Sequence, residues 1–296
     1  MENDFFRGKQ AVSRLHNAIR LNSPEKVDLL LDEGADVNIL DKNGLAPLHV
    51  AIQKDLVNIV KILLAHNADI EIRDRYGDTP LHYAANDDHH VIAAIMIAKN
   101  VNINARNDED KTPLHLASES YNLDMVKLLV EHGAEVNALD IEGDIPLCFA
   151  NRDVAKYLVN KGANIHNINK AGETILHLVD SEVAELLIEK GVTVNKRDNK
   201  DWTPLHFADW DVAKILIENN ADIDAQDRYG WTPLHFAADR GNYKKAELLL
   251  QSGAKIYLTD RHGNTPRKIA ENRSHSSLAQ LIKQHEKKNI IGIFRQ

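Results

Sequence analysis

The four-residue stretch Thr-Pro-Leu-His occurs at residues 79–82, 112–115, 203–206 and 232–235. Degenerate copies stand at residues 13–16, 46–49, 145–148, 174–177 and 265–268. The third position of the motif falls at residues 15, 48, 81, 114, 147, 176, 205, 234 and 267, so the steps are 33 residues except for three of 29. A fixed period of this length is typical of a repeat architecture. The spacing predicts nine repeats that account for nearly the whole chain.

A second set of residues keeps the same steps. It consists only of glycine and asparagine, which tolerate the left-handed conformation that ends a helix. Its members are Gly34, Asn67, Asn100, Gly133, Gly162, Gly191, Asn220 and Gly253. Within a repeat, Thr-Pro predicts the start of a first helix. An apolar pattern such as residues 124–130 predicts a second helix, and an Asp-x-x-Gly sequence such as residues 227–230 predicts a finger-like turn.

These features closely resemble the ankyrin repeat family, over roughly residues 10–285. The resemblance implies an all-α repeat solenoid of stacked helix-turn-helix units with short β-hairpin-like fingers. It also implies protein partners, bound by the finger tips and the concave face of the first helices. The expected organisation is an N-terminal extension (1–9), a single repeat array (10–285) and a C-terminal tail (286–296).

Three consecutive repeats, within about residues 142–228, lack four residues each. The interval from the motif Leu to the closing Gly shrinks from 19 residues (Leu114 to Gly133) to 15 (Leu147 to Gly162), so the deletion falls inside the helix pair. Four residues are about one helical turn. We expect shortened helices or a tightened connection, with one bent helix over residues 205–213 as the alternative.

Composition narrows the function classes. The chain has 296 residues, a net charge of −8 and one cysteine, which argues for a reducing, cytoplasmic compartment and against nucleic acid as a partner. No apolar run approaches the roughly 18 residues of a membrane helix. The first ten residues lack the pattern of a secretory signal. We therefore expect no membrane association.

No catalytic, metal or cofactor motif is present. Seven histidines occupy the same motif position, which favours a structural role between repeats: His16, His49, His82, His115, His177, His206 and His235. Cys148 stands at that position in the fifth repeat, and we expect it to be buried and inert. The chain is thus expected to be non-enzymatic, with no cofactor.

Exposed aromatic residues at variable finger and first-helix positions are the candidate partner-binding residues. They are Tyr76, Trp202, Trp210, Tyr229 and Trp231. Charged candidates near them are Asp180, Asp209, Arg228 and Asp239. Residues 170–240 carry a net charge of −6, which suits a basic or amphipathic peptide. The alternatives are aromatics that only cover neighbouring fingers or fill the space left by the deletion, and carboxylates that only keep the array soluble.

Residues 241–296 have the opposite balance, with 11 basic and 4 acidic residues. Such a surface could contact phosphates, an acidic partner or the acidic end of another copy. The leading hypothesis is a monomeric protein-interaction scaffold. The chain has 27 asparagines and 8 prolines, a composition that often reflects an AT-rich genome. Because bacteria that live inside host cells frequently have such genomes, the composition suggests an effector that an intracellular bacterium directs at host proteins in the host cytoplasm. The rivals are a structural or self-associating spacer, a regulatory subunit of a larger complex, and an enzyme acting in the groove.

Overall fold

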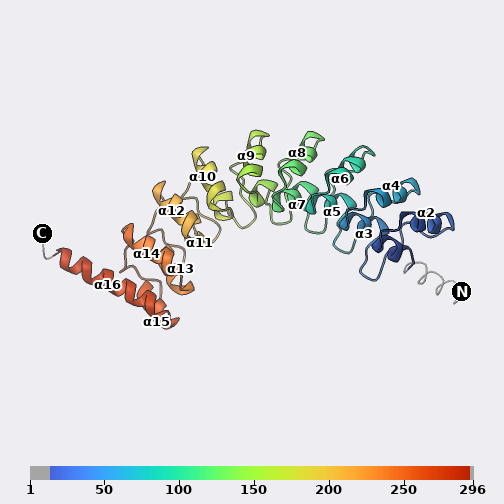
Figure 1. The fold of residues 1–296 in the computed structure, drawn as a ribbon. Helices are drawn as coiled ribbons and strands as arrows, with labels where there is room; N and C mark the ends of the chain where they lie inside the picture. The colour runs from blue at the N-terminus through green and yellow to red at the C-terminus, as the bar shows by residue number, and fades with distance from the viewer. Residues whose placement is uncertain (1–13, 294–296) are drawn as a thin grey trace. The chain divides into compact units, whose positions relative to one another are not determined.

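The computed structural model describes residues 14–293, and its fold is drawn in Figure 1. The chain divides into two compact parts, Met1–Asn164 and Ile165–Gln296, called here the N-terminal and C-terminal parts. The expected extension at residues 1–9 lies outside the described residues. None of the helices in residues 14–293 has the length and apolar content that a membrane crossing requires.

The N-terminal part holds repeats 1 to 5, each with a first and a second helix. Repeat 1 pairs helical residues 14–20 with α2 (Pro24–Asp32). The next three pairs are α3 (Pro47–Gln53) with α4 (Val57–Ala65), α5 (Pro80–Asn86) with α6 (His90–Ile97), and α7 (Pro113–Glu119) with α8 (Leu123–Glu131). Repeat 5 pairs the 3₁₀-helix η1 (Pro146–Phe149) with α9 (Arg152–Asn160).

The C-terminal part holds repeats 6 to 9. They pair the 3₁₀-helix η2 (Ile175–His177) with α10 (Ser181–Glu189), α11 (Pro204–Phe207) with α12 (Trp210–Glu218), α13 (Pro233–Arg240) with α14 (Tyr243–Gln251), and α15 (Pro266–Asn272) with α16 (Ser276–Ile293). Helix α16 continues past residue 285, where the sequence suggested that a tail begins. The last three residues, 294–296, are outside the described range.

Within each part, equivalent helices of successive repeats pack against one another. First helices pack on first helices, as α5 does on α7 and α11 on α13, and second helices pack on second helices, as α12 does on α14. The motif leucines, such as Leu81 and Leu205, are fully buried. Each fully buried side chain of this size contributes about 1.5–3 kcal/mol. A single repeat lacks this burial, so stacking stabilises the all-α repeat solenoid that the sequence predicted.

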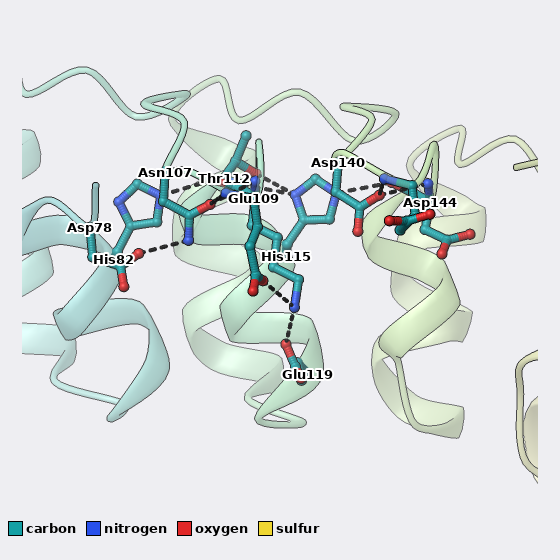
Figure 2. A network of polar contacts seen from close by, with 11 residues as sticks. Asp78, His82, Asn107, Glu109, Thr112, His115, Glu119, Asp140 and Asp144 are labelled. Atoms are coloured by element: carbon teal, nitrogen blue, oxygen red, sulfur yellow. Dashed lines mark hydrogen bonds and ion pairs between the residues drawn. The ribbon is translucent and has the colours of Figure 1, made fainter. Parts of the chain in front are cut away.

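The motif histidines link successive repeats. The backbone N–H of Thr112 donates to Nδ1 of His115 at 3.0 Å, which places the ring proton on Nε2. That Nε2 donates to the carbonyl oxygen of Asp144 in the next finger at 3.2 Å, and His82 reaches Lys111 in the same way at 3.0 Å. Figure 2 shows the two rings in this register. The predicted structural role of these histidines is confirmed.

The fingers are tight turns. Oδ1 of Asp74 accepts the backbone N–H groups of Tyr76 and Asp78 at 2.8 and 2.9 Å, and the other Asp-x-x-Gly turns repeat this arrangement. Within residues 14–293 one isolated β-bridge occurs, and it pairs Ile168 with Thr174 in a finger. The fingers are therefore hairpin-like in path, but a network of side-chain bonds holds them instead of paired strands.

The 29-residue repeats lose their four residues from the first helix and the connection. Helix α11 has four residues whereas α13 has eight, yet α12 and α14 have nine each. Ala208 is not helical, with φ −42° and ψ 137°, and separates α11 from α12. The prediction of shortened helices and a tight connection is confirmed, and the alternative of one bent helix over residues 205–213 is wrong.

Candidate interaction surface

Four aromatic side chains gather on the fingers and first helices of repeats 7 and 8. The ring of Phe236 is the centre, with ring centroids of Trp231, Trp202 and Phe207 at 5.4, 5.5 and 5.7 Å, all at steep angles. Edge-to-face pairs of this kind contribute about 0.5–1.5 kcal/mol each beyond their buried area. Tyr229, next to the cluster in sequence, is 56% exposed. The rings around Phe236 are therefore held by mutual contacts, and the exposed Tyr229 adjoins them in the sequence.

Asp227 positions the two tryptophans of this cluster. Its Oδ1 accepts the backbone N–H groups of Tyr229 and Trp231 at 2.8 Å each. Its Oδ2 accepts the indole Nε1–H of Trp202 at 2.8 Å, from the preceding finger. One buried carboxylate thus fixes the turn of its own finger and the side-chain orientation of the finger before it.

A groove of about 570 Å³ lies beside these rings in the C-terminal part. We call it the aromatic groove, and its lining residues are Trp202, Asp227, Tyr229, Trp231, Phe236, Asp239, Asp260, His262, Asn264, Ile269, Asn272 and Arg273. The volume is in the range that accommodates a small ligand or a few side chains of a peptide. Fingers and first helices of repeats 7 to 9 contribute to one surface.

Basic side chains of the chain cover the faces of these rings. The Lys200 ammonium lies 4.4 Å from the Trp202 ring centroid. The Arg240 guanidinium lies 5.3 Å from Phe207 and 5.9 Å from Phe236, and that of Arg261 lies 5.9 Å from Tyr229. Cations over ring faces gain about 0.5–1 kcal/mol at exposed sites. Lys200, Arg240 and Arg261 therefore adjoin rings that line the aromatic groove, and we call these three side chains the cations on the rim.

Two of the acidic candidates have a local structural task. Asp180 and Asp209 are the N-caps of α10 and α12, where their carboxylates accept the backbone N–H groups of Val183 and Val212 at 2.9 Å. Asn151 caps α9 in the same way. The three caps share the pattern Asn/Asp-x-Asp/Glu-Val-Ala at residues 151–155, 180–184 and 209–213, which is a local signal for the helix start in the short repeats. Neither aspartate lines the aromatic groove.

The other charged candidates belong to the groove or its rim. Asp239 lines the groove, and its Oδ1 accepts from Nε of Arg273 at 2.6 Å. Arg228 lies on the finger tip beside Tyr229, with its Nε 3.9 Å from the carboxylate of Asp201. Both partners of the second pair are well exposed, so this contact adds little to stability.

Two aromatic candidates lie elsewhere. Trp210 is the first residue of α12, the second helix of repeat 7, and not the end of the shortened first helix. It is 38% exposed, carries Lys214 over its ring at 5.9 Å, and does not line the aromatic groove. Tyr76 is 61% exposed on a finger of the N-terminal part. Only Trp202, Tyr229 and Trp231 of the five are brought together.

The comparison with protein families agrees with the repeat stack. The family described as "Ankyrin repeats (3 copies)" matches residues 15–107, 67–140, 85–169, 147–227, 179–260 and 207–291. The chain belongs to the ankyrin repeat family. A comparison with the curated proteins finds no match. Ankyrin repeats generally mediate protein–protein interaction, which makes the aromatic groove the first place to look for a partner.

A second, smaller hollow lies on the ankyrin repeats of the N-terminal part. It measures about 270 Å³ and is lined by Gln53, Asp78, His82, Tyr83, Asn86, Asp87 and Leu116. The Tyr83 hydroxyl donates to Oδ2 of Asp74 at 2.8 Å, and burial together with this carboxylate raises the pKa of Tyr83. The hollow has one large aromatic side chain, so it offers less apolar area than the aromatic groove.

Burial favours the neutral forms of several motif histidines and of the cysteine. Burial lowers the pKa of His82, His115 and His206 to about 4. Burial raises the pKa of the Cys148 thiol, which keeps it protonated and unreactive. No group of three or more His, Cys, Asp or Glu side chains within residues 14–293 is arranged to hold a metal ion.

Proposed function

We propose that this chain is a non-enzymatic interaction scaffold that binds a protein partner through the aromatic groove of repeats 7 to 9. The observation that carries the proposal is the convergence of Trp202, Tyr229 and Trp231 on one groove. Two of them stand at the variable positions of a single finger, and the third reaches across from the finger before it. Tryptophan and tyrosine are the residues that most often anchor protein interfaces.

The groove is pre-organised for binding. Trp202 and Trp231 are held by Asp227 and by their contacts with Phe236 before any partner arrives. Side chains that are already ordered lose little conformational freedom on association, which favours affinity. Tyr229 adds an exposed ring that a partner can cover. An amphipathic segment of a protein fits this combination of apolar wall and charged rim.

The non-enzymatic part of the proposal is supported by the state of the titratable side chains. The motif histidines use both ring nitrogens in hydrogen bonds within the stack of repeats, as His115 does with Thr112 and Asp144. A histidine that acts as a general base needs a free ring nitrogen, and its pKa should lie near the pH of the reaction. The histidines most repeated in the sequence therefore do not meet the needs of acid–base catalysis.

The finer features of the proposal are a monomeric state and a role as an effector on host proteins in the host cytoplasm. The effector role is supported by composition, 27 asparagines and 8 prolines. Sedimentation at low salt tests the monomer. Delivery is tested by expressing the chain with a reporter in the source organism and assaying the reporter in the cytoplasm of an infected cell.

The groove itself is tested by affinity capture with three forms of the chain. These are the unaltered chain, a Tyr229→Ala/Trp231→Ala variant, and a Trp210→Ala variant, which removes an exposed aromatic outside the groove. Circular dichroism confirms that each variant folds. A partner kept by the first and third forms and lost by the second supports the proposal. Equal capture by all three places the binding site on other repeats.

A further inference from the structure

We propose that the segment bound in the aromatic groove is an acidic peptide, with an aromatic or aliphatic anchor between Asp or Glu residues. This inference rests on the proposed function and adds the charge of the partner. It differs from the basic ligand that the charge of residues 170–240 suggested. The difference arises because the structure separates carboxylates that are already engaged from cations that remain available.

The carboxylates that line the groove are engaged within the chain. Asp227 accepts three N–H groups, as described above, and is 8% exposed. Asp260 is 7% exposed and accepts the backbone N–H groups of His262 and Asn264 and the Asn264 side-chain amide, at 2.8 to 3.0 Å. Asp239 is in an ion pair with Arg273. A basic ligand would have to compete with these donors for each of the three carboxylates.

The cations on the rim are available. Lys200, Arg240 and Arg261 are exposed, and each lies over a ring of the aromatic cluster or of Tyr229. Within residues 14–293 none of the three makes an ion pair with a carboxylate. A guanidinium that is stacked by its face keeps the N–H groups of its edge free, and these form bidentate bonds to carboxylates.

Each of the three cations lies over a ring that lines the groove, although none of them is itself a lining residue. Lys200 is fixed over Trp202, Arg240 over Phe207 and Phe236, and the rings of Trp202 and Phe236 are 5.5 Å apart. Arg261 lies over Tyr229, which lines the same groove. A peptide that places an apolar side chain against the rings therefore brings its neighbouring residues within reach of these cations. Glutamate or aspartate there gains charge-assisted hydrogen bonds, while lysine or arginine meets like charge.

The charge of the whole chain does not oppose this partner. The N-terminal part carries 17 basic and 26 acidic residues, whereas the C-terminal part carries 19 and 18. Charges farther away than a screening length of about 8 Å have little effect at physiological salt. The C-terminal part, which contains the groove, is close to neutral by composition, so the net charge of −8 does not by itself oppose an acidic ligand there.

The test compares two fluorescent peptides of equal length and identical Trp and Leu anchors, one flanked by glutamates and one by lysines. Binding to the full chain is followed by fluorescence anisotropy, at low and at physiological salt. The variant Lys200→Gln/Arg240→Gln/Arg261→Gln removes the rim charges but keeps the apolar stems. Lys214→Gln is the matched control, because Lys214 lies over Trp210 outside the groove. Tyr229→Ala removes the exposed anchor.

We expect the acidic peptide to bind about tenfold more tightly than the basic one, and the triple variant to lose about tenfold in affinity for it. Lys214→Gln should leave the affinity unchanged. A basic peptide that binds more tightly, and is lost with Tyr229→Ala, would overturn the inference and leave the proposed function standing. Absence of binding by both peptides would contradict the groove as a peptide site. An oligothymidine bound more tightly than the acidic peptide would overturn the inference in favour of nucleic acid.

Discussion

The ammonium nitrogen of Lys245 lies 3.0 Å from the backbone carbonyl oxygen of His206, where Lys245 is 3% exposed. Lys245 is the third residue of α14, a position that apolar side chains such as Ile59, Met125 and Val212 fill in other second helices. His206 lies in the four-residue helix α11, whose last carbonyls lack helical partners. The lysine therefore supplies a donor that the missing turn of repeat 7 would have supplied.

This buried amine predicts an alkaline change in stability. Burial lowers the pKa of Lys245 from 10.5 to about 7. Between these values the unfolded chain binds a proton that the folded chain has released, so the free energy of unfolding rises with pH. One proton corresponds to a slope of up to about 1.4 kcal/mol per pH unit. Urea unfolding at several pH values from 7 to 10 measures the slope, and Lys245→Met should reduce it.

The exposed neighbour Lys244 gives the matched control for that experiment. Lys244→Met should keep the slope of the unaltered chain. A Lys245→Met chain whose stability still rises with pH as steeply as the Lys244→Met chain would show that the buried amine is protonated at neutral pH.

The histidines predict a second, acidic change in stability. His82, His115 and His206 have pKa values of about 4 because burial disfavours the imidazolium. From pH 6.5 down to pH 4 the unfolded chain takes up protons that the folded chain refuses, so the free energy of unfolding falls as the pH falls. His115→Gln should weaken the chain by roughly 2 kcal/mol at pH 7 and make its stability less sensitive to acid. Urea unfolding measures both effects, and His132→Gln, at an exposed site, should change neither.

The caps of the short repeats predict a position-specific loss of stability. Asp209→Ala removes the carboxylate that accepts the backbone N–H of Val212 and should cost about 1 kcal/mol. Asn122 occupies the same place at the start of α8 but makes no side-chain capping bond. Asn122→Ala should therefore cost less. Thermal unfolding compares the two variants, and an equal loss in both would mean that the cap does not stabilise repeat 7.

The repeat architecture could be predicted because each repeat encodes it locally. Thr112 and Pro113 mark a helix start. His115 hydrogen-bonds only to Thr112, three residues before it, and to Asp144 in the next finger. The local pattern carries a further signal at Asp180 and Asp209. The Val-Ala pair that stands three and four residues after each of them indicates a helix N-cap, a structural role in addition to the partner-binding role predicted from charge.

The aromatic groove could be predicted only in part, because its geometry depends on the stacking register. The finger positions of Trp202 and Trp231 predict that both are candidate binding residues. The bond from Trp202 to Asp227 spans 25 residues and forms only when the two fingers lie side by side. Trp210 is eight residues from Trp202, and yet the non-helical Ala208 ends α11 and Trp210 begins another helix, α12. The available cations on the rim likewise emerged from the contacts and not from the net charge.

The finger that carries Tyr229 and Trp231 should be sensitive to a single methyl group. Gly230 has φ +82°, and a Cβ there would lie 3.1 Å from the Cα of Asp260 and the carbonyl oxygen of Thr259 in the next finger. Gly263 has φ +73° and nothing within 4 Å of such a Cβ. Both alanine variants bear the left-handed penalty of about 1–2 kcal/mol, but only Gly230→Ala must also separate two fingers.

Gly230→Ala should therefore lose more stability than Gly263→Ala in urea unfolding. It should also weaken binding in the aromatic groove, because the separated fingers carry Tyr229 on one side and Asp260 and His262 on the other. Gly263→Ala keeps the groove side chains in place and should bind as the unaltered chain does. If the two variants lose stability equally and both bind normally, the close approach of the fingers at Gly230 does not shape the groove.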